Sequence, residues 1–239
     1  MIRLALDAAS SRCTVALEAG GAIRARHLDG PRRHTREVLG LVEELLGEIG
    51  GGPRDITRVL TGDGPGSFTG LRVAAAVAKA LCWDRPEVRW ATAPSLLIRA
   101  TAHVPPSGGI VLAVSDALRG ELYAGEWCFA TGEVEAIGGP VRTLRPEELA
   151  GHRAEVVVGT IPDALLAAVR AATGREPITG DVALPDARAL LALDGRPGGV
   201  VEVTDPSSWQ PLYGRPAEAQ AVWERTHGRA LPDPSYHAG

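Results

Sequence analysis

Several features that would point to particular classes of protein are scarce or missing in this sequence. Among its 239 residues there are only three cysteines, Cys13, Cys82 and Cys128. They stand far apart and form no Cys-x-x-Cys pair, which excludes the common zinc and redox motifs. We expect them to be free thiols in a reducing cytoplasm. No window approaches the ~20 apolar residues of a membrane helix, and the N-terminus carries no signal-type apolar run, so we expect no membrane association.

The chain also lacks an excess of basic residues. It contains 25 basic and 29 acidic residues, which gives a net charge of −4. A protein that binds nucleic acid tightly is usually strongly basic or carries a basic stripe. Direct, tight binding of nucleic acid by this chain alone is therefore not expected. The hydrophobic content of 45% is enough for one large domain or two small lobes.

Metal-binding and catalytic patterns are missing as well. The six histidines are scattered at positions 27, 34, 103, 152, 227 and 237, and no two of them stand four residues apart. No His-Glu-x-x-His motif occurs. Adjacent carboxylates such as Glu43 and Glu44 point to different faces of a helix, so they cannot act as an acid–base pair. The sequence therefore nominates no catalytic residue and no metal ligand.

The most distinctive stretch is a glycine-rich segment, Gly62–Arg72, between a short apolar run and an alanine-rich helix. Four glycines and a proline within nine residues favour a tight strand-to-helix turn. Ser67 or Thr69 can cap the helix, whose free N–H groups would attract an anion. Gly64, Gly66, Ser67 and Thr69 are weak candidates for a cofactor site. However, the segment fails the phosphate-loop, dinucleotide and nucleophile-elbow patterns, so an anion site and a plain turn both remain open.

Hydrophobic patterning predicts a βββαβα order in the first 103 residues, which we take as one lobe. Gly20-Gly21 indicates a hairpin, and Gly50-Gly51-Gly52-Pro53 ends the first helix. The expected elements are strands Ile2–Asp7, Cys13–Ala19 and Ala22–Leu28, helix Thr35–Ile49, strand Arg58–Thr61, helix Leu71–Leu81, strand Val88–Ala91 and helix Ser95–Ala102.

After a Pro/Gly-rich linker the same order returns over residues 110–185, which predicts a second, smaller lobe. Its expected elements are strands Ile110–Ser115, Glu121–Phe129 and Glu133–Ile137, a short helix Pro146–Ala150, strand Glu155–Val158 and helix Asp163–Ala172. A weak helix at Ala187–Ala192 begins a segment, residues 187–225, that could rejoin the first lobe. The Pro/Gly-rich residues 228–239 are expected to be a flexible tail.

As a whole string, Gly-Pro-Gly-Ser-Phe-Thr-Gly-Leu-Arg at positions 64–72, followed by Lys79, closely resembles the TsaB (YeaZ) family. These bacterial proteins are needed to make threonylcarbamoyladenosine in tRNA. Asp116–Tyr123 and the Pro-x-Tyr-x-Arg segment at positions 211–215 carry the same resemblance. It implies the ASKHA, or actin-like, fold, an α/β architecture of two lobes with a duplicated βββαβα order.

The resemblance also bears on chemistry. In the wider superfamily an acidic residue at the place of Asp7 helps to hold metal–nucleotide phosphates, but Ala8 and Ala9 supply no hydroxyl groups. Asp7 could equally cap backbone N–H groups at its strand end. The catalytic paralogue TsaD binds iron or zinc through a His-x-x-x-His pair, and the equivalent stretch here, Thr92–Ile98, contains no ligand. We therefore expect no metal, no cofactor and no catalytic residue.

The resemblance implies a non-catalytic subunit that binds the TsaD transferase and, with the ATPase TsaE, supports threonylcarbamoyl transfer to adenosine 37 of tRNA. Contact with tRNA would be indirect, and the chain alone would form a homodimer. The alternatives are an autonomous ASKHA-type enzyme, either kinase-like or a glycoprotease-like metallopeptidase, and a homodimeric scaffold with no role in tRNA.

In the resembled family two helices pair with the same helices of TsaD or of a second copy. The first helix carries one apolar stripe with Leu39 off it, and the second is mostly alanine, which permits close approach. We expect Leu39, Leu46 and Val77 to form an exposed apolar patch. The candidate interface residues are His34, Val38, Leu39, Leu41, Val42, Leu45, Leu46, Leu71, Ala74, Val77, Ala78 and Leu81.

Overall fold

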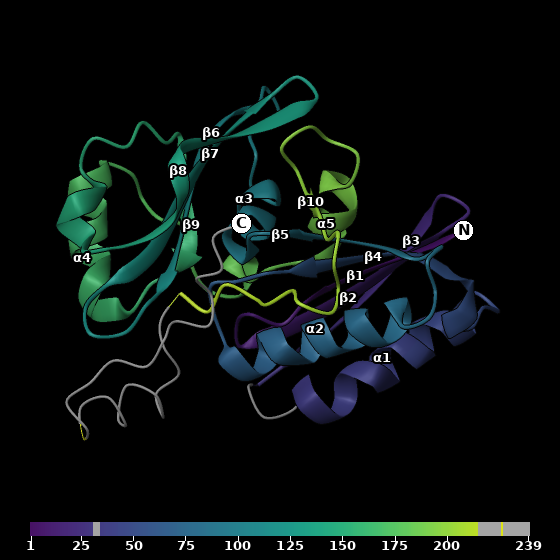
Figure 1. Cartoon of the computed structure of the whole chain (residues 1–239). Helices are drawn as coiled ribbons and strands as arrows, with labels where there is room; N and C mark the ends of the chain where they lie inside the picture. Colours follow the sequence, from purple (N-terminus) through teal and green to yellow (C-terminus); the bar gives the residue numbers. More distant parts are fainter. Residues whose placement is uncertain (31–33, 215–225, 227–239) are drawn as a thin grey trace.

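The computed structural model of the chain describes residues 1–30, 34–214 and 226, and it contains two β-sheets with helices on their faces (Figure 1). The first half of the chain supplies β1 (Ile2–Asp7), β2 (Arg12–Ala19), β3 (Ala22–Asp29), α1 (His34–Glu48), a 3₁₀ turn (Pro53–Asp55), β4 (Ile56–Gly62), α2 (Phe68–Cys82), β5 (Arg89–Ala93) and α3 (Ser95–Thr101).

The larger sheet has the strand order β10-β5-β4-β1-β2-β3. β1 is antiparallel to β2 and parallel to β4, so the hairpins lie on one side of β1 and the βα units on the other. Successive side chains on a strand point to opposite faces. Leu4 and Leu6 accordingly pack against α1 and α2, whereas Ala5 belongs to the cluster formed with α3 and with α5 (Ala187–Leu193). The sheet is therefore covered on both faces.

The second sheet repeats this arrangement. Its elements are β6 (Gly109–Asp116), β7 (Leu122–Ala130), β8 (Glu133–Leu144), a 3₁₀ turn (Pro146–Leu149), β9 (Val156–Thr160) and α4 (Asp163–Thr173). The order β8-β7-β6-β9 matches β3-β2-β1-β4, and β6 is again antiparallel to one neighbour and parallel to the other. The predicted α/β fold with two βββαβα units is confirmed, with a 3₁₀ turn in place of the second unit's first helix.

The chain then returns to the larger sheet. α5 packs on the same face as α3, and β10 (Val201–Glu202) pairs antiparallel with β5. Two expected bounds were too short: the strand expected to end at Ile137 continues to Leu144, and the second helix begins at Phe68 because Ser67 caps it. Residues 215–225 and 227–239, which include the expected tail and Arg215, lie outside the described residues.

Candidate functional site

The glycine-rich segment lies directly against the turn that follows β1. The amide of Ser67 donates a hydrogen bond to the carbonyl oxygen of Ala9 at 2.7 Å. A Cβ on Gly66 would lie 2.2 Å from that oxygen, and a Cβ on Gly70 would lie 1.8 Å from the carbonyl oxygen of Ala8. Both distances are far below van der Waals contact, so glycine is required at these positions for the close approach of two backbones.

Several of the loop's backbone donors are used within the chain. The amide of Asp63 donates to the carbonyl of Ala93 at 3.0 Å, and the amide of Gly64 donates to the Ser95 hydroxyl at 3.2 Å. The hydroxyl of Ser67, rather than that of Thr69, accepts from the amide of Gly70 and caps α2. An anion-binding loop needs its N–H groups free to point at the ligand. These three N–H groups, with that of Ser67, already have partners.

The C-terminal segment covers the same loop. The amide of Leu212 donates to the carbonyl of Asp63 at 2.8 Å, and its carbonyl oxygen lies 2.1 Å from the place that a Cβ on Gly64 would take. Tyr213 packs on Phe68 with 4.5 Å between ring centroids, and its hydroxyl accepts a hydrogen bond from Arg72. Two segments that carry the family resemblance, far apart in the sequence, thus meet over one loop.

Asp7 ends β1 beneath the glycine-rich segment and is fully buried. The Ser95 hydroxyl donates a hydrogen bond to one carboxylate oxygen at 2.8 Å, and a Cβ on Gly62 would lie 1.9 Å from the same oxygen. Burial raises the pKa of Asp7 to about 6, against the opposing effects of Ser95 and the positive charge of Arg99. Asp7 is therefore enclosed by the chain's own atoms, which leaves no space on that side for a ligand.

A second acid, the partly buried Asp63, lies near Asp7. Burial and the negative charge of Asp7 raise its pKa to about 7, although Thr92 forms a hydrogen bond with it. One carboxylate oxygen of each acid is buried without a hydrogen-bond partner among the described residues. Two acids with raised pKa values in one place are unfavourable when both are ionised. The group is thus sensitive to pH near neutrality.

Arg99 joins this group to the second lobe. Its side chain is buried, and Nη1 donates to the Thr160 hydroxyl at 2.8 Å and to the carbonyl oxygen of Val114 at 3.3 Å. Burial lowers its pKa to about 10, partly offset by the charge of Asp7. These contacts run from α3 to β9 and β6, so they hold the two sheets together. Within this group the geometry indicates a structural role.

The predicted exposed patch on α1 and α2 is partly wrong. Leu39 is 56% exposed, but Leu46 is only 2% and Val77 only 9% exposed. Both belong to the core between the helices and the larger sheet, because the apolar stripes pack there. Of the other interface candidates, Leu41 and Leu81 are half-buried, His34 is the first residue of α1, and the rest are buried in the monomer's own core: Val38, Val42, Leu45, Leu71, Ala74 and Ala78.

Ion pairs show which flank of α1 faces which neighbour. Arg26 on β3 bonds Glu44 and Glu48, so that flank of the helix faces β3. Leu39 lies on the opposite flank, because a residue advances by about 100° around a helix and 39 and 44 are five residues apart. That flank is the one next to α2. On α2, Arg72 and Lys79 bond the C-terminal segment, and Ala80 lies about 100° further around the helix than Lys79.

The outward surface of the two helices combines small residues and a few large apolar side chains with charged residues such as Glu43 and Arg72. On α2, Ala76 and Ala80 are exposed one turn apart, and Trp83, the residue that follows the helix, is 81% exposed. On α1, Gly40 and Gly47 are exposed, and a Cβ on either would meet open space. We call this surface the helix-pair face; it comprises Leu39, Gly40, Gly47, Ala76, Ala80 and Trp83 (α1 and α2 in Figure 1).

Five of these six residues are not among the candidate interface residues: Gly40, Gly47, Ala76, Ala80 and Trp83. The alanine-rich composition of the second helix was the available signal, and the spacing of Ala76 and Ala80, one turn apart, places them on one side of it. Over residues 1–30 and 34–214, no three His, Cys, Asp or Glu side chains come together as a possible metal site. No helix in this part of the chain is long and apolar enough to cross a membrane.

Comparison with known proteins shows which protein families this chain resembles. A family profile described as TsaD, tRNA N6-adenosine threonylcarbamoyltransferase, matches residues 29–142. The Escherichia coli protein named tRNA threonylcarbamoyladenosine biosynthesis protein TsaB is 35% identical over 125 residues, which cover 52% of this chain and 54% of that protein. The Bacillus subtilis protein of the same name is 26% identical over 239 residues, covering 93% of this chain and 98% of that protein.

A Haemophilus influenzae TsaB is 32% identical over 124 residues, covering 50% of this chain and 51% of that protein. The chain thus spans about half the length of two of these relatives and almost all of the third. Among solved structures, YeaZ from Pseudomonas aeruginosa is similar with a TM-score of 0.72 and 29% identity, covering 89% of this chain and 99% of that one. These likenesses support the actin-like fold that the sequence predicted.

Proposed function

Because this chain belongs to the TsaB (YeaZ) family and so to the biosynthesis of threonylcarbamoyladenosine in tRNA, we propose that it acts there as a non-catalytic subunit. In this proposal it binds a TsaD-type transferase, which carries out the transfer to adenosine 37, and a TsaE-type ATPase acts with the pair. The chain works in the cytoplasm and contacts tRNA only indirectly. Its own contribution is a binding surface.

The observation that carries the proposal is the helix-pair face. Glycine in a helix interior costs about 0.5–1 kcal/mol relative to alanine, and nothing in the monomer occupies the space beside Gly40 or Gly47. Ala76 and Ala80 likewise leave the exposed side of the neighbouring helix without large side chains at those positions. Such a surface allows a partner's helices to approach closely, and Trp83 at its end is the residue type most enriched in binding hot spots.

The choice of partner rests on the likeness between this chain and the transferase family. The TsaD profile matches residues 29–142, which include both α1 and α2. A transferase with an equivalent pair of helices could pack those helices against the helix-pair face. The two similar surfaces would then meet about a pseudo-two-fold axis. A second copy of this chain offers the same surface, which accounts for the proposed homodimer when the chain is alone.

The non-catalytic part of the proposal is supported by the glycine-rich segment. Four of its N–H groups bond Ala9, Ala93, Ser95 and Ser67, and the C-terminal segment covers it. A kinase-like activity would need those donors for nucleotide phosphates. Thermal stabilisation by ATP would favour that alternative, and a bound metal ion would favour a peptidase.

The test is to place a charge on the helix-pair face. Ala80→Glu should abolish co-elution with a TsaD-type transferase in size-exclusion chromatography. An unpaired charge buried in an interface costs on the order of 3–5 kcal/mol of association. The matched control is Ala171→Glu, which changes an exposed alanine on α4 in the other lobe. Both variants should keep the parent's circular dichroism, since both positions are exposed.

The proposal would be wrong if Ala80→Glu and Leu39→Glu bound the transferase as well as the control does. Loss of binding in all three variants, including Ala171→Glu, would also contradict it, because the effect would then come from added negative charge rather than from this surface.

A further inference from the structure

Three arginines stand side by side in the larger sheet, at the end opposite the glycine-rich segment. In the strand register Arg3 on β1 pairs with Arg58 on β4, and Arg58 pairs with Arg89 on β5. In-register residues on neighbouring strands point to the same face and lie ~4.8 Å apart at their backbones. Like charges at that spacing repel one another. A row of this kind therefore requires anions close by.

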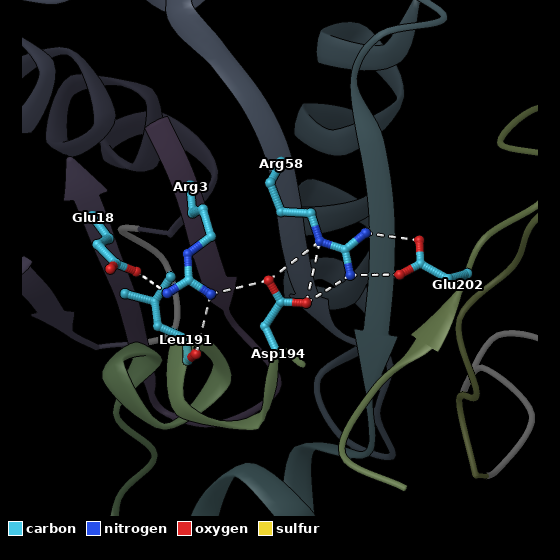
Figure 2. A network of polar contacts seen from close by, with 6 residues as sticks. All are labelled: Arg3, Glu18, Arg58, Leu191, Asp194 and Glu202. Atoms are coloured by element: carbon cyan, nitrogen blue, oxygen red, sulfur yellow. Dashed lines mark hydrogen bonds and ion pairs between the residues drawn. The ribbon is translucent and has the colours of Figure 1, made fainter. Parts of the chain in front are cut away.

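The chain supplies some of those anions itself (Figure 2). Asp194, at the end of α5, lies between two arginines: it accepts from Arg58 Nη2 at 2.7 Å and from Arg3 Nη1 at 3.0 Å. Glu18 pairs with Arg3 from the other side, and Glu202 on β10 takes both terminal nitrogens of Arg58 at 2.7 and 2.5 Å. The first two arginines of the row are thus neutralised.

The third arginine of the row has no such carboxylate partner among the described residues. Arg89 is exposed and forms no hydrogen bond with any residue that the structure describes, although it lies close enough to Glu202 to lower the pKa of that carboxyl group. Arg196, in the connection between α5 and β10, is also exposed and likewise forms no side-chain hydrogen bond within the described ranges. Both line a cavity of about 480 Å³ that also reaches Arg3, Arg58, Asp194 and Glu202.

The lining of this cavity is positively charged in a chain that is negative as a whole. Its four arginines and two carboxylates leave a charge of +2, or +1 when Glu18, the partner of Arg3, is included, against −4 for the full sequence. The Arg58 guanidinium shows how an oxyanion would be held there, because the two Glu202 oxygens already sit on its two terminal nitrogens. Glu202 is 53% exposed on a two-residue edge strand and could leave that place.

We propose that this cavity binds the phosphate group of a small phosphorylated molecule, held by Arg89, Arg196 and the terminal nitrogens of Arg58 as Glu202 turns away. Arginine suits this role because its planar guanidinium matches the geometry of phosphate oxygens and keeps its charge. The site is separate from the helix-pair face, at the opposite end of the strands from the glycine-rich segment, and it does not depend on the proposed function.

The experiment is isothermal titration calorimetry at low ionic strength with inorganic phosphate, pyrophosphate and AMP as separate probes. Binding of either inorganic ion supports a site for free phosphate, and binding of AMP alone supports a nucleotide site. The double variant Arg89→Gln/Arg196→Gln should weaken binding about tenfold or more, which is about 1.4 kcal/mol. The control Arg54→Gln/Arg145→Gln removes two exposed arginines elsewhere and should leave affinity unchanged.

A third variant tests the role of Glu202. Glu202→Gln removes the carboxylate that competes for Arg58, so it should tighten phosphate binding severalfold, whereas general loss of folding would weaken it. The proposal is contradicted if none of the three probes shows binding when its concentration reaches about 10 mM, since a weaker dissociation constant would not count as a site. It is equally contradicted if the two double variants lose affinity to the same extent, or if Glu202→Gln binds more weakly than the parent.

Discussion

Asp63 offers a sharp test of the buried acidic group, because its carboxyl should destabilise the fold at neutral and higher pH. Burial and the charge of Asp7 raise its pKa from 3.8 to about 7. The unfolded chain loses this proton near pH 4, whereas the folded chain keeps it until about pH 7. Between these values folding takes up a proton, so this group's contribution is most favourable at low pH and is lost as pH rises through 7.

Asp63→Asn removes the titration and leaves an oxygen that can accept from Thr92. Each pKa unit corresponds to 1.36 kcal/mol, so the advantage of the Asn variant over the parent should grow by about 3 kcal/mol between pH 5 and pH 8. In a domain of this size that is a rise in Tm on the order of 6–12 °C at pH 8. Urea unfolding at several pH values measures the difference directly.

Asp84→Asn is the matched control, since it changes an exposed aspartate at the end of α2 that has a left-handed backbone suited to either residue. Its difference from the parent should stay constant across the same pH range. A constant difference for Asp63→Asn as well, or an Asn variant less stable than the parent at pH 8, would show that Asp63 is not held in the environment described here.

The remaining predictions concern packing, the arginine row and ligands. Gly66→Val should lower the free energy of unfolding by ~3 kcal/mol or more in urea, because its Cβ would meet the Ala9 carbonyl, whereas Gly47→Ala should raise it by about 0.5–1 kcal/mol. Asp194→Ala should cost about 1.5–3 kcal/mol in the same assay, since Arg58 and Arg3 each lose one of two carboxylate partners, and an effect below 1 kcal/mol would refute this. Elemental analysis should find no stoichiometric iron or zinc, EDTA should leave the Tm unchanged, and calorimetry should find no micromolar binding of ATP; a full equivalent of tightly bound zinc would contradict the first of these.

Much of the fold could be predicted because local patterns and global packing agree. The βββαβα order of each half follows from the alternation of apolar residues and from glycine-rich turns. The sequence alone identifies the glycine-rich segment, but it does not identify the role of that segment. Only the structure shows that Gly66 and Gly70 are glycines because the backbone of Ala8 and Ala9 lies against them.

The parts that sequence reasoning missed depend on which neighbours the elements meet. Periodicity showed that α1 has an apolar stripe, but it could not tell a stripe facing the sheet from one facing a partner. Leu46 and Val77 were therefore placed on the surface although they are in the core. The row of Arg3, Arg58 and Arg89 could not be predicted for a similar reason, because strand register joins residues that stand 55 and 31 positions apart in the sequence.

The central claim, that this chain supports the modification by binding the transferase, is tested most directly in a reconstituted reaction. The chain, a TsaD-type transferase, a TsaE-type ATPase and unmodified tRNA are combined with the threonylcarbamoyl donor, and threonylcarbamoyladenosine is quantified by mass spectrometry of nucleosides. We expect product with the parent and with Ala171→Glu, and little or none with Ala80→Glu or without the chain. Full yield in the absence of the chain, or with Ala80→Glu in its place, would contradict the account.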